Sequence, residues 1–444
     1  MNLKIIKTYD IRGVYPKDIN EKDAFLIGRS FASFLSSKTK KKRPAIVVGR
    51  DGRISSPSLF KEAKRGIIGG GADVYDIGMV TTPLLNFTVA KKKYNGGLMV
   101  TASHNPPQYN GFKLIKEKAL QIHGDEIREV GKIAEKGGFG ENGGEIKNLN
   151  PFPDYEKKLL GEFKEIKELK VVADYGNGVS SVTGKKILAS LRIELINLFD
   201  RIDGLFPNHH PNPHNRENFA FLQKKVREHK ADLGIFFDGD GDRSILVDEK
   251  GEIVSPDFLL ALLAEDELKR GKGKVYYDLR FSKIVGEKIK KDGGDPVMMR
   301  VGNPFYKEKI IKGDGILGGE LSGHVMFKNH FGIDDGLYTA LRAMAILSEK
   351  KSPLSEMINP LKVYHQSEEI NIEVKNKKAA IERVKSAFAD GKSRDIDGVY
   401  ISYPDWWFNL RESNTEDLIR LKIEAKRKDV LDRKRKEIIR TVKS

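Results

Sequence analysis

The stretch Gly97-Leu98-Met99-Val100-Thr101-Ala102-Ser103-His104-Asn105-Pro106 joins an apolar run to a polar turn that contains a serine. The apolar run, Gly97–Val100, predicts a short buried strand, which places Ser103 at the carboxyl end of that strand. A hydroxyl at this position is well placed for covalent chemistry. A Ser-His-Asn-Pro turn taken alone is more often a capped structural loop. The rest of the chain therefore decides between the two interpretations.

Helices and strands alternate on the N-terminal side of this turn. The spacing of apolar residues predicts helices over 21–36, 59–69 and 81–90, and strands over 44–48 and 73–77. This order predicts a parallel, doubly wound sheet with functional loops at the carboxyl ends of its strands. One such loop holds Arg50 and Asp51, which are expected to form an ion pair. Arg12 is expected at a tight turn after an N-terminal strand, with its side chain reaching into a cleft.

The most informative motif follows the apolar strand predicted over 231–237. It reads Asp238-Gly239-Asp240-Gly241-Asp242-Arg243. Three carboxylates within five positions repel one another unless a divalent cation neutralises them. With Glu249 at the twelfth position the spacing superficially matches an EF-hand, but Arg243 stands where that loop needs glycine and a predicted strand follows. An acidic surface turn is the remaining alternative to a metal site.

Two later loops combine residue types that bind polar ligands. Glu320, Ser322 and His324 alternate, so their side chains can point to one side and bind the hydroxyls of a ligand. Arg411 to Thr415 contributes a guanidinium, two hydroxyls and an amide, a candidate phosphate site for which a polar surface turn is the alternative. The connector 206–214 holds three of the nine histidines, but its three prolines predict an extended segment rather than a metal site.

The length of 444 residues predicts three or four domains, because a usual domain has about 100–200 residues. The pattern of elements divides the chain at about 1–150, 151–252, 253–364 and 365–444. The last of these units is expected to be smaller and to contain fewer strands than the others.

The composition limits the classes of function. Basic residues exceed acidic ones, 79 to 63, and the net charge of +16 suggests an anionic partner. The basic residues form short clusters without interleaved aromatic residues, so we expect a solvated surface and no nucleic-acid partner. No apolar run is long enough to span a bilayer and the first residues lack a secretory h-region, so we expect a cytoplasmic protein without a membrane partner. The absence of cysteine excludes disulfides, iron–sulfur clusters and thiol nucleophiles.

Four motifs together point to one family. The sequence TASHNP at 101–106, the triple aspartate, the loop Gly319–His324 and the loop Arg411–Thr415 closely resemble the α-D-phosphohexomutase family, in particular its phosphomannomutase/phosphoglucomutase branch. The resemblance covers the whole chain, with the motifs in the same order. It implies an α/β protein of three similar mixed α/β domains, followed by a smaller α+β C-terminal domain, around a central cleft. In order, the domains would carry the phosphoserine loop, the metal-binding loop, the sugar-recognition loop and the phosphate-binding residues.

The resemblance also implies a role for each motif residue. Ser103 would be the phosphorylated nucleophile and would bind Mg²⁺ together with Asp238, Asp240 and Asp242. The groups around the transferring phosphoryl would be Arg12, Lys113 and Arg243, with Lys113 and His324 as candidates for proton transfer. The substrate-binding residues would be Arg280, Asn303, Glu320, Ser322, His324, Arg411, Ser413, Asn414 and Thr415. At 303 and 280 the family usually has histidine and lysine; Asn303 carries no proton to transfer, and Arg280 keeps the charge in a different geometry.

The implied activity is a phosphohexomutase that interconverts the 6-phosphate and the 1-phosphate of mannose or glucose through a phosphoserine. A hexose 1,6-bisphosphate would serve as activator and intermediate, and the protein would be a monomer or a weak homodimer. A phosphoglucosamine mutase is an alternative, although Leu321 fits the hexose branch better than the glutamine usual in the amino-sugar branch. A phosphosugar-binding or nucleic-acid-binding homologue without turnover is another.

Overall fold

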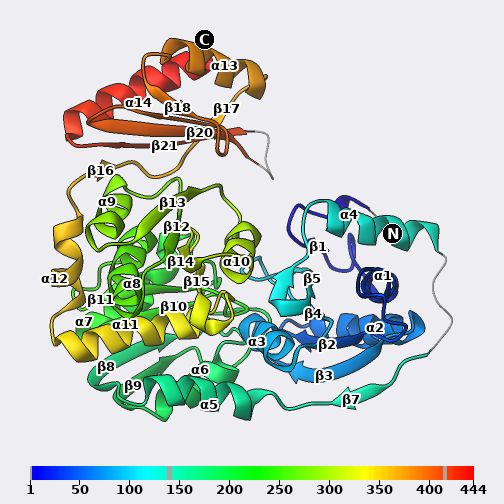
Figure 1. Cartoon of the computed structure of the whole chain (residues 1–444). Helices are drawn as coiled ribbons and strands as arrows, with labels where there is room; N and C mark the ends of the chain where they lie inside the picture. Colours follow the sequence, from blue (N-terminus) through cyan, green and yellow to red (C-terminus); the bar gives the residue numbers. More distant parts are fainter. Residues whose placement is uncertain (1–2, 138–142, 414–417) are drawn as a thin grey trace.

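The computed structural model describes residues 3–137, 143–413 and 418–444, which form four consecutive units, each built on its own β-sheet. Figure 1 shows the first unit on one side of the second and third, and the C-terminal unit stacked on the third. Among the described residues, no helix combines the length and the apolar character needed to cross a bilayer.

The first unit is a sheet of mixed direction. Its strands follow the order β1 (Ile11–Val14), β5 (Tyr109–Lys116), β4 (Gly96–Val100), β2 (Ala45–Arg50), β3 (Asp73–Met79) and β7 (Ile146–Asn148), with β6 (Leu120–Gln121) beside β5. The helices of this unit are α1 (Glu21–Thr39), α2 (Ser56–Gly69), α3 (Thr82–Lys92) and α4 (Asp125–Lys136). The prediction of a parallel sheet is correct for β4, β2 and β3 but wrong for β1 and β5, which are antiparallel to their neighbours. The reason is that the chain returns from the Ser103 turn directly alongside β4.

Two expectations near the N-terminus are also wrong. Between residues 3 and 10 the structure has a short 3-10 helix, Leu3–Ile5, and no strand. Arg12 lies on the edge strand β1 and not at a tight turn, because Ile11 to Val14 pair with Phe112 to Tyr109 of β5. Pairing with β5, the strand that follows the Ser103 turn, brings Arg12 close to that turn.

The second and third units each contain a four-stranded sheet with one antiparallel edge. The second has the order β11 (Ser244–Asp248), β10 (Leu233–Phe237), β8 (Lys167–Asp174) and β9 (Arg192–Leu198), with α5 (Phe152–Phe163), α6 (Ser181–Ala189) and α7 (Ala220–His229). The third has the order β13 (Asp295–Met299), β12 (Lys274–Asp278), β14 (Gly315–Gly319) and β15 (Val325–Phe327). Its helices are α8 (Pro256–Arg270), α9 (Lys283–Lys291), α10 (Asn303–Lys312), α11 (Gly336–Lys350) and α12 (Leu354–Ile358).

The C-terminal unit is an antiparallel sheet with two helices, α13 (Lys377–Ala387) and α14 (Lys428–Lys443). Its strands are β16 (His365–Gln366), β17 (Ile370–Glu373), β18 (Lys392–Arg394), β19 (Val399–Ser402), β20 (Trp406–Glu412) and β21 (Leu418–Ala425). The expectation of fewer strands is wrong, since its described sheet has six strands against four in the second unit. Several of these strands have only two to four residues, too few to show an alternating pattern in the sequence.

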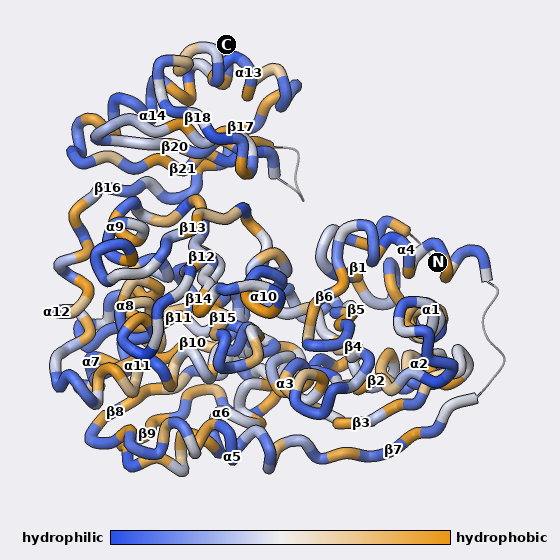
Figure 2. Tube along the Cα trace, in the orientation of Figure 1, coloured by the Kyte–Doolittle hydropathy of each residue, from blue (hydrophilic) through white to orange (hydrophobic). Residues whose placement is uncertain are grey.

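The apolar cores join the four units to different extents. One continuous cluster includes Met99 of the first unit, Phe237 of the second and Leu341 of the third. The C-terminal unit has a core of its own and meets the third unit at a small cluster of Leu279, Tyr400 and Trp407. Figure 2 shows hydrophobic residues along both the strands and the helices of the C-terminal unit. The first three units are therefore joined more extensively than the fourth.

Candidate functional site

Ser103 lies in the turn beyond β4, with its backbone in the left-handed region at φ 52°. Residues other than glycine seldom adopt this conformation, and such strain concentrates at functional sites. Ser103 is only 4% exposed. Its Oγ donates a hydrogen bond of 3.2 Å to Asp238 Oδ2 and accepts one of 2.9 Å from Arg243 Nη2. The serine of the first unit is thus held between a carboxylate and a guanidinium of the second.

The loop between β10 and β11 gathers the three aspartates of the motif. One oxygen of each of Asp238, Asp240 and Asp242 lies within 4.8 Å of the others, and all three residues are buried. Gly239 permits the close approach to the serine turn, because a Cβ at this position would lie 2.4 Å from Ser103 O. The motif therefore does not form a solvated surface turn. Glu249, the twelfth residue of the EF-hand alternative, instead binds Ser355, which excludes that alternative.

Two cations pair with the three aspartates. Lys113 Nζ on β5 donates to Asp240 Oδ2 at 2.6 Å and to Asp242 Oδ2 at 2.5 Å. Arg243 Nη2 donates to Asp238 Oδ2 at 2.7 Å. Burial acts to lower the pKa of Lys113, but the two aspartates raise it above its ordinary value, so the ammonium stays charged. Burial raises the pKa of Asp238 to about 7 against the opposing effect of Arg243.

The oxygen atoms of this cluster are suitable ligands for a hard divalent cation. Asp240 Oδ1 and Asp242 Oδ1 are buried and have no hydrogen-bond donor among the described residues. A buried carboxylate oxygen without a partner is costly unless a cation compensates it. Oxygen-only ligands are those that Mg²⁺ prefers, and the Ser103 hydroxyl adjoins the same cluster.

Arg12 reaches the serine turn from the other side. Its Nη1 donates to Asn105 Oδ1 at 2.5 Å and its Nη2 pairs with Asp10. Arg12 and Arg243 therefore both contact the turn that carries Ser103.

The loop after β14 brings Glu320, Ser322 and His324 together. Ser322 Oγ donates to Glu320 Oε2 at 2.8 Å and lies 2.8 Å from His324 Nδ1. His324 Nε2 is 3.6 Å from Asp242 Oδ1, which connects this loop to the triple aspartate. Burial acts to lower the pKa of His324, but Asp242 and Glu320 raise it to about 9. Burial acts to raise the pKa of Glu320, but His324 and Arg280 lower it to about 2.

Arg411 and Arg280, two of the residues predicted to bind the substrate, lie at the junction of the third and fourth units. Arg411 is not in a loop but on β20, 3% exposed, and its Nη2 pairs with Glu369 Oε1 at 2.7 Å. Arg280 Nη1 approaches the same oxygen at 3.6 Å, while its Nη2 pairs with Asp278 Oδ2 at 2.5 Å. Ser413 is buried beside the end of β20, and Asn414 and Thr415 lie outside the described residues.

Asn303 begins helix α10 next to the sugar loop. Its Nδ2 donates to Asp334 Oδ2 at 2.7 Å, and the neighbouring Gly302 N–H donates to Glu320 Oε1 at 2.7 Å. The Asn303 side chain therefore holds a hydrogen bond to Asp334, but an amide cannot transfer a proton.

Sequence reasoning missed three residues near the site. Glu369 accepts from Arg411, and nothing in a Ser-Glu-Glu stretch signals that partner. His214, from the connector predicted to be extended, has its ring 5.5 Å from the ring of His104. The third, Arg53, binds the serine turn from the loop in which Arg50 and Asp51 were expected to pair. That expectation is wrong, since Arg50 donates to the backbone oxygen of Asp51 while the Asp51 carboxylate pairs with Arg53.

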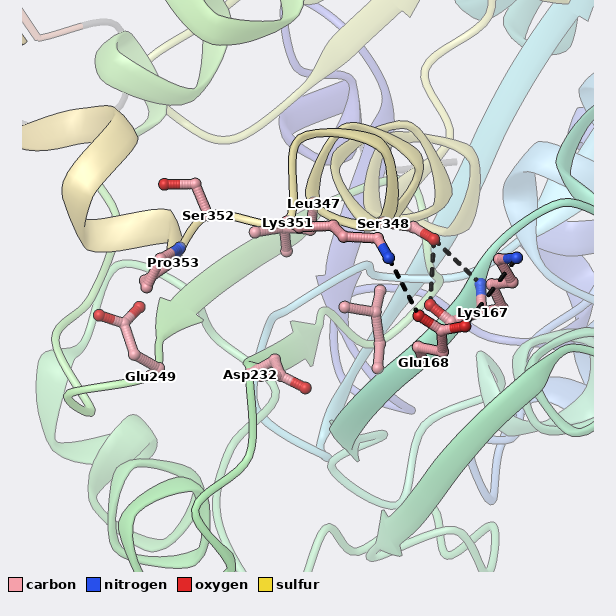
Figure 3. Close-up of a pocket in the computed structure, with 10 residues that line it drawn as sticks. Lys167, Glu168, Asp232, Glu249, Leu347, Ser348, Lys351, Ser352 and Pro353 are labelled. Atoms are coloured by element: carbon pink, nitrogen blue, oxygen red, sulfur yellow. Dashed lines mark hydrogen bonds and ion pairs between the residues drawn. The ribbon is translucent and has the colours of Figure 1, made fainter.

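One cavity lies away from these loops. The cavity in Figure 3, about 290 Å³, is bounded by the start of β8 and the end of α11, where Lys351 pairs with Glu168 and Ser348 bonds Lys167. None of its lining residues belongs to the loops described above. The cavity is therefore separate from the clustered side chains where the units meet.

Comparison with known proteins agrees with the fold. The models of the phosphoglucomutase/phosphomannomutase alpha/beta/alpha domains I, II and III match residues 3–141, 153–251 and 255–364, and the model of the C-terminal domain matches 369–441. A phosphomannomutase/phosphoglucomutase of Pseudomonas aeruginosa is 36% identical over 97% of this chain and 93% of its own length. A phosphomannomutase of Methanocaldococcus jannaschii is 36% identical over 98% of this chain and 97% of its own.

A solved structure is similar over the whole chain. It is that of a phosphoglucomutase/phosphomannomutase family protein from Burkholderia thailandensis, with a TM-score of 0.92 and 35% identity, covering 100% of this chain and 97% of that one. Three α/β/α units and a C-terminal unit, with a buried serine facing a triple aspartate, define the class of phosphosugar mutases. Within that class, the chain belongs to the phosphoglucomutase/phosphomannomutase family.

Proposed function

We propose that this protein interconverts hexose 6-phosphate and hexose 1-phosphate, with mannose and glucose as the sugars, through a phosphoserine at Ser103. One observation carries the proposal: Ser103 Oγ is bonded to both Asp238 and Arg243, beside two aspartate oxygens without a donor. The proposed domains are 1–150, 151–252, 253–364 and 365–444, and the proposed oligomeric state is a monomer or a weak homodimer.

The residues of the chain divide the reaction between them. Phosphorylated Ser103 transfers its group to the free hydroxyl of the sugar phosphate, so the bond from Oγ to phosphorus breaks and a bond from phosphorus to the sugar oxygen forms. Arg12, Lys113 and Arg243 stabilise the charge of the phosphoryl group in flight. Lys113 and His324 are the proposed groups for proton transfer. Both are held in the charged form, so one of them gives a proton to the leaving Ser103 Oγ and takes up the proton that the sugar hydroxyl releases. Asp238, Asp240 and Asp242 would hold Mg²⁺, which supplies further charge stabilisation when bound.

The product of this step is a hexose 1,6-bisphosphate, which the same enzyme would also accept as activator. The bisphosphate turns over, and its other phosphate returns to Ser103, so the second end of the sugar needs an anchor that does not distinguish the two orientations. Arg280 and Arg411, with Ser413 and the predicted Asn414 and Thr415, would bind the phosphate that is not reacting. Glu320, Ser322 and Asn303 would bind sugar hydroxyls.

The test is turnover with a matched pair of variants. Purified protein with Mg²⁺ and glucose 1,6-bisphosphate is assayed on mannose 6-phosphate and glucose 6-phosphate, with glucosamine 6-phosphate as a third substrate. Ser103→Ala is expected to lower turnover by at least about 10³-fold, since a covalent step is lost. Ser36→Ala, at a half-buried serine of α1 that donates a hydrogen bond to Lys41 O, is the control and keeps full activity.

Each failure has its own meaning. Activity on glucosamine 6-phosphate alone favours the phosphoglucosamine mutase alternative, and no activity on any substrate refutes the proposed function. Full turnover by Ser103→Ala refutes only the assignment of the nucleophile.

A further inference from the structure

Arg53 is a buried cation next to the reacting serine for which neither the sequence motifs nor the reaction above has a role. It follows β2 in the loop that leads to α2, and it is 1% exposed. Burying a guanidinium is costly unless all of its donors find acceptors. The positions of those acceptors therefore indicate what the residue does.

Four of the five guanidinium N–H donors bind a single turn. Nη1 donates to Pro106 O at 2.8 Å and to Tyr109 O at 3.1 Å. Nη2 donates to Ser103 O at 2.8 Å and to Asn105 O at 2.7 Å. The Arg53 side chain thus hydrogen-bonds to three backbone carbonyls of the turn that carries Ser103 and to a fourth at the start of β5.

The turn needs such a donor because of its own sequence. Pro106 and Pro107 have no backbone N–H and so contribute no donor for a local hydrogen bond. Ser103 is held at φ 52°, a strained conformation that persists only where the surroundings enforce it. Gly239 packs against the Ser103 carbonyl from the second unit, and Arg53 binds the same carbonyl.

Arg53 is itself fixed on both sides. Its fifth donor, Nε, pairs with Asp51 Oδ2 at 3.2 Å, and the Asp51 carboxylate also accepts from the Arg53 N–H at 3.0 Å and from Ser56. The guanidinium lies 5.1 Å from the ring centroid of Phe206, which comes from the second unit. Arg53 therefore joins the serine turn to both units that form the reacting site.

We propose that Arg53 is a positioning residue, which holds the Ser103 turn in the geometry required for phosphoryl transfer and does not contact the substrate. All five N–H donors of the Arg53 guanidinium are occupied by protein acceptors, and its contacts with the turn are to backbone carbonyls. Arg12 and Arg243 differ, because they contact side chains of the turn, those of Asn105 and Ser103. This inference rests on the proposed function, in which Ser103 is the phosphorylated group.

The decisive variant is Arg53→Lys. Lysine keeps the positive charge but has only three N–H donors, all on one nitrogen. It therefore cannot bind all four carbonyls that the planar guanidinium of Arg53 binds. We expect kcat to fall about 10²-fold with KM little changed, because a misplaced nucleophile slows the chemical step without altering the sugar-binding residues. The rate at which glucose 1,6-bisphosphate phosphorylates Ser103, followed by intact-protein mass spectrometry, is expected to fall by a similar factor.

Arg50→Lys is the matched control. Arg50 is the last residue of β2, three residues before Arg53, and donates to the backbone oxygen of Asp51, so the same substitution there leaves kcat and the phosphorylation rate unchanged. Thermal unfolding of both variants establishes that the assays report on folded protein.

Phe206→Leu decides the question if Arg53→Lys does not fold. It removes the aromatic face under the guanidinium but leaves all five hydrogen bonds, so a smaller fall in kcat at unchanged KM is expected. Wild-type kcat in either folded variant, or a loss confined to KM, overturns the inference. Absence of turnover and of Ser103 phosphorylation in the wild-type protein instead refutes the proposed function on which it rests.

Discussion

The two ends of the site are built differently. At the proposed reacting end, Ser103, Lys113 and the triple aspartate come from two units that both contribute to one continuous apolar cluster, and each of these residues is hydrogen-bonded to another of them. At the anchoring end, Arg280 and Arg411 come from units with separate cores and meet at one carboxylate, Glu369.

The difference matches two tasks. Chemistry needs groups fixed to within a fraction of an ångström, and a shared core provides that rigidity. An anchor for a substrate that binds in two orientations needs only charge and reach. Substitutions at the reacting end should therefore act on kcat, and substitutions at the anchoring end should act on KM.

Asp240→Asn is expected to have the largest effect in this comparison. It leaves an oxygen for Thr82 or Lys113 to contact but removes the negative charge beside the partnerless Oδ1. We expect kcat to fall by about 10³-fold and the Mg²⁺ concentration for half-maximal activity to rise. Chelation of the metal from the wild-type protein should have the same effect.

The control for this variant is Asp314→Asn, which alters an exposed aspartate paired with Lys274 at 2.8 Å. A metal titration of Asp240→Asn that matches wild type would contradict the assignment of the metal site.

The reacting end was also the more predictable of the two from sequence. Ser103 and the three aspartates lie at the carboxyl ends of strands 4 and 10, so strand prediction places them at sheet edges and the repulsion of three carboxylates signals a cation. The interaction of Arg53 with Ser103 was not predictable, because its acceptors are backbone carbonyls 50 to 56 residues away, which no side-chain pattern reveals.

The anchoring end was predicted less well for a physical reason. The sequence predicted Arg411 in a polar loop, but it lies on strand β20 and pairs with Glu369. Because Glu369 is 42 residues away in the chain, no local sequence pattern indicates this pair. Residues 419–425 showed the alternation of a strand, but four of the six strands have only two to four residues and give no periodic signal, so the number of strands was underestimated.

Arg411→Met tests the anchoring end and should have the intermediate effect. Methionine keeps much of the apolar stem but loses the charged fork, so we expect kcat/KM to fall about 10²-fold, mostly through KM, in steady-state kinetics on glucose 1-phosphate. Arg216→Met is the control, because Arg216 also pairs with a glutamate, Glu368, at 2.6 Å but both side chains are exposed. A loss in kcat at constant KM would remove the distinction between the two ends.

Glu424→Gln should have the smallest effect on turnover, and it tests how the anchoring unit is attached. Glu424 on β21 is 1% exposed and accepts from Trp407 Nε1 at 2.7 Å and from the Lys283 N–H of α9 at 2.9 Å. Burial raises the pKa of Glu424 to about 7, against the hydrogen bonds from Ser282, Lys283 and Trp407. An unfolded glutamate titrates near about 4.3, so the folded state binds the proton more tightly.

The sign of the pH dependence follows from this difference. The stabilisation is complete below the unfolded pKa and is lost as the pH rises through about 7, where the folded carboxyl ionises. Glutamine keeps the accepting oxygen and does not titrate. The free energy of unfolding of wild type relative to Glu424→Gln should therefore decrease between about pH 5 and pH 8, by at most about 3 kcal/mol. Thermal unfolding of both proteins across this range measures the decrease. If the difference in the free energy of unfolding between the two proteins stays constant over this range, the contact of the C-terminal unit with α9 does not depend on the protonation of Glu424.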